Sequence, residues 1–168
     1  MQRVPWLLAF VLVAGAGEAQ AHTETIKAAL KGHTVSGFVL KSVKVGAGVQ
    51  ENWVRASDGA QLTIKVLPKQ TPALVTARVN ALNKGVKLQD ELLFRCETRG
   101  TTMAWTNFRA DHGATFRTYR YLRLEGSQLL EESITFPKAA PSFDYARFAF
   151  VTMRKTATDL FKRLSLVK

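Results

Sequence analysis

Apolar and polar positions repeat along this chain at two different spacings. Residues 62–66 alternate strictly between apolar and polar side chains, which is typical of a half-buried β-strand. Strand-like runs also cover residues 35–45 and 52–56. Asp58-Gly59 lies between two of these runs, and this dipeptide is a strong signal for a tight turn. The pattern therefore predicts a β-hairpin around Asp58-Gly59.

Helical spacing marks two further segments of the first half. Thr71-Pro72 is a good helix start, because threonine caps and proline at the first helical position loses no hydrogen bond. The apolar stripe of this helix consists of Val75, Val79 and Leu82. Gly85 is expected to end it. Residues 24–31 are typical of a shorter helix that stops at Gly32.

The second half begins with four strand candidates separated by short turns that contain glycine. The candidates are Glu91 to Thr98, Thr102 to Arg109, Thr115 to Leu124 and Gln128 to Phe136. Short turns of this kind join neighbouring antiparallel strands. We therefore expect a β-meander.

The last segment leaves two alternatives open. Pro137 and Pro141 interrupt the chain, and apolar residues then recur at helical spacing over residues 143–164. Residues 147–153 are also rich in β-formers, so a final strand followed by a shorter helix fits the same residues.

Together these elements predict an α+β fold, with an antiparallel β-meander of about six strands packed with helices, including a C-terminal helix. The pattern resembles the PsbP/Mog1-like group of α/β/α sandwiches. The resemblance is carried by residues 121–130, which form a strand, a glycine turn and a second strand, and by residues 134–137, where an apolar-proline pair precedes a helix. It implies a non-catalytic scaffold and identifies no site residues.

The N-terminus has the features of an export signal. A positive Arg3 is followed by an apolar run over residues 4–16, and Ala19-Gln20-Ala21 provides small residues where a signal peptidase cleaves. We predict a signal peptide over residues 1–21 and a single α+β domain over residues 22–168. The apolar run is too short to span a bilayer, so no transmembrane helix is expected in the mature chain.

The net charge indicates the class of partner, and the cysteine content shows whether a disulfide can form. The formal net charge of +11 draws the protein towards anionic partners, such as an envelope protein, an anionic ligand or, peripherally, an anionic membrane surface. Nucleic acid does not fit an exported protein. Cys96 is the only cysteine, so no intramolecular disulfide is available. We expect a periplasmic or secreted location.

One strand carries the candidate ligand-binding residues. Arg117, Tyr119, Tyr121 and Arg123 lie at alternating positions and therefore share one face of the predicted sheet. Arginine beside aromatic rings suits an anionic or sugar ligand. The alternative is a solvated face in which Glu131 on the next strand pairs with these arginines.

A second hypothesis concerns copper. Cleavage after Ala21 makes His22 the first residue, and an N-terminal histidine chelates Cu(II) through its amine and its ring. His112, with Asp111 beside it, is the candidate second ligand, and His33 is the other histidine. The site resembles the histidine brace of copper proteins at these residues, but the chain lacks their all-β pattern. The alternative is a frayed terminus and an ordinary turn.

The sequence contains no recognisable catalytic motif. Glu131 and Glu132 are neighbours on a strand and point to opposite faces, so they cannot act as a carboxylate pair. No serine lies in a nucleophile elbow, and no glycine loop suits a phosphate. The prediction is an exported, non-enzymatic binding or accessory protein with a basic surface. The alternatives are a copper-binding protein and a hydrolase whose site the sequence does not reveal.

Overall fold

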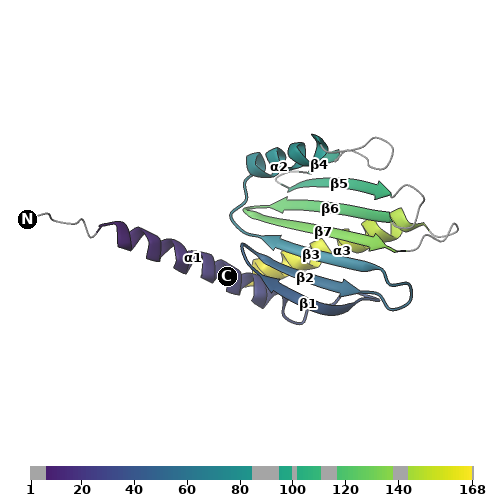
Figure 1. The fold of residues 1–168 in the computed structure, drawn as a ribbon, viewed down its shortest axis with the longest axis horizontal. Coiled ribbons are helices and arrows are strands. Elements are labelled where there is room, and N and C mark those ends of the chain that lie inside the picture. The colour runs from purple at the N-terminus through teal and green to yellow at the C-terminus, as the bar shows by residue number, and fades with distance from the viewer. Residues whose placement is uncertain (1–6, 85–94, 100–101, 111–116, 138–143, 168) are drawn as a thin grey trace, which may run out of the picture.

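A computed structural model describes residues 7–84, 95–99, 102–110, 117–137 and 144–167 (Figure 1). The described helices are α1 (Leu7–Leu30), α2 (Pro72–Lys84) and α3 (Tyr145–Leu166). The described strands are β1 (Val39–Val45), β2 (Val49–Val54), β3 (Gln61–Leu67), β4 (Arg95–Arg99), β5 (Thr102–Ala110), β6 (Arg117–Glu125) and β7 (Gln128–Phe136).

All seven strands form one antiparallel sheet in the order β1-β2-β3-β7-β6-β5-β4. The predicted α+β class and the meander of β4 to β7 are confirmed. The sheet has seven strands rather than about six, and a tight turn at residues 46–48 joins β1 to β2. At Gly48 a side chain would meet the carbonyl oxygen of Val66, so glycine is required where this turn lies against β3.

The hairpin predicted at Asp58-Gly59 joins β2 to β3. The Asp58 carboxylate accepts a hydrogen bond from the Ala60 amide at 3.1 Å and one from Nε of Arg55 at 2.9 Å. Gly59 has a φ of +71°, a conformation that favours glycine. The two residues that predicted this turn, Asp58 and Gly59, are therefore the ones that stabilise it.

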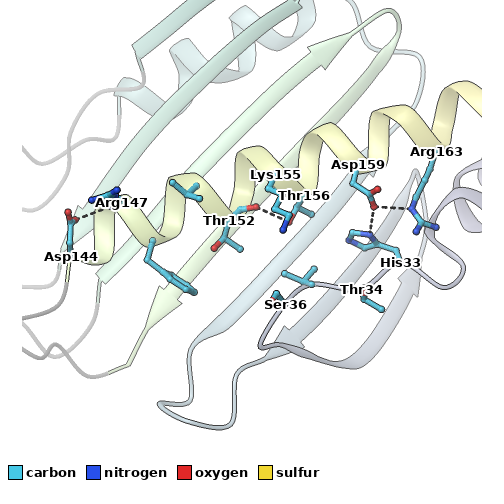
Figure 2. Close-up of a pocket in the computed structure, with 13 residues that line it drawn as sticks. His33, Thr34, Ser36, Asp144, Arg147, Thr152, Lys155, Thr156, Asp159 and Arg163 are labelled. Carbon is cyan, nitrogen blue, oxygen red and sulfur yellow. Dashed lines mark hydrogen bonds and ion pairs between the residues drawn. The ribbon is translucent and has the colours of Figure 1, made fainter.

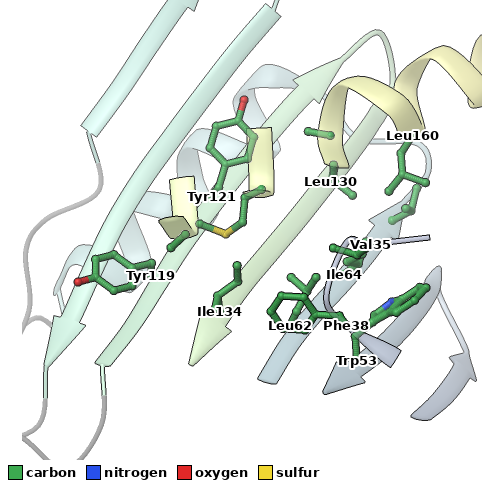
Figure 3. Close-up of a cluster of buried hydrophobic side chains, with 14 of the residues drawn as sticks. Val35, Phe38, Trp53, Leu62, Ile64, Tyr119, Tyr121, Leu130, Ile134 and Leu160 are labelled. Carbon is green, nitrogen blue, oxygen red and sulfur yellow. The ribbon is translucent and has the colours of Figure 1, made fainter. Parts of the chain in front are cut away.

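One face of the sheet is covered by α3 and the C-terminal part of α1 (Figure 1). The described part of the segment with two alternatives forms one helix from Tyr145 to Leu166, so no strand occurs over residues 147–153. Asp144 caps this helix, because its carboxylate accepts from the Arg147 amide at 3.0 Å. Its buried residues are Tyr145, Ala149, Met153, Thr156, Ala157, Leu160 and Phe161. They pack on Leu62, Ile64, Leu130 and Ile134, so the main core lies between α3 and the centre of the sheet (Figure 3).

The other face is covered at one end by α2, which begins at Pro72 as predicted. Val75 and Val79 of its stripe are buried. Their cluster is completed by Leu67, Leu122, Leu124 and Leu129 from the sheet. Beyond this small cluster, the same face presents polar side chains, of which Thr63 and Ser133 are half-buried.

Helix α1 extends away from the sheet towards the N-terminus (Figure 1). The helix predicted over residues 24–31 ends as expected, at a glycine with a φ of +72°, but begins much earlier, at Leu7. Ile26, Ala29 and Leu30 are buried against the domain, whereas Gln20 and Ala21 are exposed. Among the described residues, no helix combines the length and the apolar character needed to cross a membrane.

Candidate functional site

A groove lies between α3 and the segment that follows α1 (Figure 2). It encloses about 940 Å³. Residues 33–36 form one wall, and the side chains of α3 between Arg147 and Arg163 form the other. A space of this size accommodates a small organic molecule or a short segment of another protein.

The wall formed by residues 33–36 is shaped by the end of α1. The His33 amide donates to the carbonyl oxygen of Leu30 at 2.9 Å, which turns the chain out of the helix. The side chains then alternate, because His33 and Val35 are buried while Thr34 and Ser36 are exposed. This wall therefore offers the hydroxyl groups of Thr34 and Ser36 to the groove.

The α3 wall is basic and apolar. Arg147, Val151 and Lys155 occur at intervals of four residues, so they form one exposed stripe along the helix. Val151 is 60% exposed, so its apolar side chain is accessible from the groove. Phe148 lies beside this stripe and is half-buried, with the guanidinium of Arg55 at 4.1 Å from its ring centroid. The stripe combines positive charge with apolar surface.

One end of the groove contains a hydrogen-bonded cluster (Figure 2). Nδ1 of His33 lies 3.1 Å from Oδ2 of Asp159, and Nε of Arg163 donates to the same oxygen at 2.9 Å. Burial acts to raise the pKa of Asp159, but the hydrogen bonds from Arg163 and His33 outweigh it and lower that pKa. The carboxylate is therefore ionised at neutral pH, and Nδ1 of His33 carries the donated proton.

The imidazole of His33 is neutral at neutral pH, because burial lowers its pKa more than the bond to Asp159 raises it. Nε2 is buried and has no hydrogen-bond partner among the described residues. The ring meets Trp53 edge to face, with centroids 5.8 Å apart. Such an imidazole can accept a proton, but no described contact pairs it with a serine or threonine nucleophile.

The four candidate ligand-binding residues do share one face, as predicted, but it is the face covered by α3. Tyr119 and Tyr121 are each only 5% exposed and belong to the main core (Figure 3). Burial raises the pKa of both hydroxyl groups. The expectation of an open Arg/Tyr surface is therefore wrong, because the helix of the last segment fills the space a ligand would need.

The two arginines of that set lie at the margins of α3 and already have partners. The guanidinium of Arg117 is 5.4 Å from the ring of Tyr145. Arg123 forms an ion pair with Glu125 at 2.7 Å and stacks over Phe161 at 5.0 Å. These contacts attach β6 to the helix, so both side chains act as packing groups in this conformation.

The candidate copper ligands are not brought together by the described residues. His22 lies half-buried within α1, while Asp111 and His112 lie outside the residues that the structure describes. Over the described part of the chain, no three His, Cys, Asp or Glu side chains gather as a metal site would require. The copper hypothesis stays a prediction about the chain after cleavage.

Sequence reasoning missed the groove itself, although one signal for it was present. The helical spacing of apolar residues in the last segment is confirmed, since Tyr145, Ala149 and Met153 are buried. Arg147 and Lys155 recur with Val151 at the same spacing on another side of the helix. An apolar residue between two cations on an otherwise solvated face is the feature that marks the groove. The wall formed by residues 33–36 has no comparable sequence signal, because tertiary packing alone places it.

The sequence matches no known protein-family model and no curated protein. The resemblance to the PsbP/Mog1-like group therefore stays a prediction, and the groove is interpreted from its own residues.

Proposed function

We propose that this protein is an exported, non-enzymatic binding protein whose groove along α3 takes an anionic amphipathic ligand. The observation that carries the proposal is the exposed stripe of Arg147, Val151 and Lys155, which places an apolar side chain between two cations in the groove along α3. A ligand with a carboxylate or phosphate head and an apolar body matches both properties at once.

The cations of this stripe are available for a ligand. No ion pair joins the side chain of Arg147 or Lys155 to another described residue, whereas Arg163 is held by Asp159. Phe148 and Val151 supply the apolar contact, and the hydroxyl groups of Thr34 and Ser36 face them from the other wall. Arg163 is thus a fixed part of the groove, while Arg147 and Lys155 are the groups that meet the anion.

The proposal is tested with 8-anilinonaphthalene-1-sulfonate, an anionic amphipathic dye whose fluorescence rises in apolar sites. We expect saturable binding to the native protein and competition by decanoate. Lys155→Glu should weaken the affinity by about tenfold, because it replaces attraction by repulsion. Lys162→Glu is the matched control, since Lys162 is also exposed on α3 but does not line the groove.

Equal binding by the Lys155→Glu and Lys162→Glu variants would contradict the proposal, because the net charge alone would then explain the dye. A native near-ultraviolet circular dichroism spectrum must accompany each titration, since the same dye binds partly unfolded chains.

Export is supported by the position of the predicted cleavage site. Ala21 is exposed where α1 leaves the domain, and the buried residues of that helix begin later, at Ile26. One exposed ion pair, Lys69 with Glu18 at 3.3 Å, joins the described part of the leader to the domain, and such pairs contribute about 0–1 kcal/mol. Removal of residues 1–21 is therefore expected to leave the folded domain intact.

The mass of the protein recovered from a bacterial periplasm tests export. We expect a chain that begins at His22, and an unprocessed cytoplasmic chain would contradict the signal-peptide prediction. The same measurement bears on copper, because a mature terminus other than His22 removes the proposed N-terminal ligand. If His22 is the terminus, a Cu(II) titration followed by electron paramagnetic resonance tests for nitrogen ligation that His112→Ala abolishes.

A further inference from the structure

Strand β1 lies at one edge of the sheet and pairs only with β2 among the described residues (Figure 1). An edge strand presents backbone N–H and C=O groups that can pair with another strand. Proteins commonly protect such edges with charges, bulges or covering segments. Here a bulge at Lys41 interrupts the pairing, but the register with β2 resumes from Ser42 to Val45.

Exposed apolar side chains are concentrated on this edge. The described residues include seven large apolar side chains that are exposed, and four of them belong to β1. These four are Val39, Leu40, Val43 and Val45, with exposed fractions between 40% and 56%. Scattered single residues of this kind are normal, whereas four on one strand indicate a surface that is covered by a partner.

Two of these side chains extend the main core. Leu40 and Val45 are opposite Trp53 and Val49 of β2, which belong to that core, and Val43 is opposite the buried carboxylate of Glu51. A groove of about 210 Å³ runs between the end of α1 and this part of the sheet, and Leu30 and Val49 contribute to its lining. The apolar face therefore continues beyond the helices that cover it.

The charges around this edge favour an acidic partner. Lys31, Lys41 and Lys44 are exposed, and no ion pair joins them to another described residue. Lys27, which lines the groove, pairs with Glu24 at 2.8 Å. A second copy of the chain brings the same lysines and a net charge of +11, so it is repelled. An acidic segment is attracted.

We propose that the open edge of β1 accepts one extended segment of an acidic protein partner as an additional strand. The backbone of that segment pairs with the free edge and its apolar side chains cover Leu40 and Val43. Its carboxylates, on the opposite face of the added strand, approach Lys44. This surface is separate from the groove along α3 and does not depend on the function proposed for that groove.

The probe for this proposal is a blocked, fluorescein-labelled heptapeptide that alternates glutamate and valine. Fluorescence anisotropy should show saturable binding to the native protein. A peptide that alternates lysine and valine has the same β-propensity and the opposite charge, and it should bind at least about tenfold more weakly. Lys44→Glu should reverse this preference, whereas Lys162→Glu should leave it unchanged.

Amide hydrogen exchange identifies the mode of binding. Strand addition predicts slower exchange for some amides of residues 39–45 when the acidic peptide is bound. Three results would overturn the proposal. They are equal binding of both peptides, no change in exchange over residues 39–45, and a dimer in sedimentation that loses its stability when Val43→Glu is introduced. The dye titration of the α3 groove is unaffected by any of them.

Discussion

The two faces of the sheet differ in how much of their surface the helices cover. On one face, α3 and the end of α1 cover a core that includes Leu62, Ile64 and Ile134. On the other, α2 covers one end only, and polar residues such as Thr63 and Ser133 occupy the middle. The strict alternation of apolar and polar side chains over residues 62–66 of β3 correctly predicts this difference between the two faces. Because the larger apolar cluster lies on the α3 face, we expect most of the stability of the domain to come from that face.

Strand β6 shows where alternation fails. Leu122 and Leu124 mark one face as apolar, so Tyr119 and Tyr121 on the other face suggest a solvated surface. Both pairs are buried, because α2 covers the first and α3 covers the second. A tyrosine at a core margin buries its ring against a helix and needs a polar neighbour for its hydroxyl. The sequence of one strand does not reveal that a distant helix returns to cover it.

Substitutions of two adjacent residues of β7 should show the largest difference in stability between the two faces. Ile134 is fully buried under α3, whereas Ser133 is half-buried on the opposite face. Ile134→Ala should destabilise the domain by about 2–5 kcal/mol, because it leaves a cavity. Ser133→Ala should change the free energy of unfolding by less than about 0.5 kcal/mol. Urea denaturation of both variants measures the difference, and equal effects would contradict the assignment of the core.

Glu132 is an acidic residue buried on the apolar α3 face, and its substitution is expected to give the second largest change in the free energy of unfolding. Its carboxylate is buried, and neither oxygen has a hydrogen-bond partner among the described residues. Burial raises its pKa well above 4.5, more than the charge of Arg123 lowers it. The folded state therefore keeps a proton that the unfolded state loses as the pH rises above about 4.5, so this group lowers stability with increasing pH.

Glu132→Gln removes that titration. The variant should be more stable than the wild type at pH 8, and the difference should shrink as the pH falls towards 4. The expected slope is up to about 1.4 kcal/mol per pH unit between the two pKa values. Urea midpoints at both pH values measure it. A variant that is less stable than the wild type at pH 8 would show that the carboxylate has a stabilising partner.

The titration of His33 should give a smaller pH dependence of stability, and its sign should be opposite to that of Glu132. Burial lowers its pKa below 6.5, so the unfolded state binds a proton first as the pH falls. Stability should therefore decrease as the pH drops from 6.5 through the lowered pKa. Asp159 partly offsets the burial, which keeps the effect smaller than that of Glu132. In His33→Gln this pH dependence should disappear, and an unchanged profile would assign it to another group.

The smallest effect is expected on the α2 face. The ion pair between Arg78 and Glu131, at 2.9 Å, connects α2 to β7. Because Arg78 is exposed, Arg78→Ala should cost less than about 1 kcal/mol, and added salt should reduce that cost further. Thermal unfolding at low and high salt measures it. A loss comparable to that of Ile134→Ala would mean that the second face stabilises the domain as much as the first.

Local chemistry made most of the fold predictable. Asp58-Gly59 and Thr71-Pro72 mark a turn and a helix start by conformational preference, and both are confirmed. The end of α1 was predictable at Gly32 for the same reason. The groove as a whole was not predictable, because its wall at residues 33–36 and its wall on α3 come from opposite ends of the chain. Only the packing of α3 against the end of α1 brings them together.

The most direct test of the groove is a titration of the mature, isotope-labelled protein with decanoate, followed through the chemical shifts of its backbone amides. The account predicts that the largest changes occur at residues 34–36 and over residues 147–156, with little change over residues 39–45. An absence of saturable changes, or changes centred on residues 39–45, would contradict the assignment of the α3 groove as the ligand site.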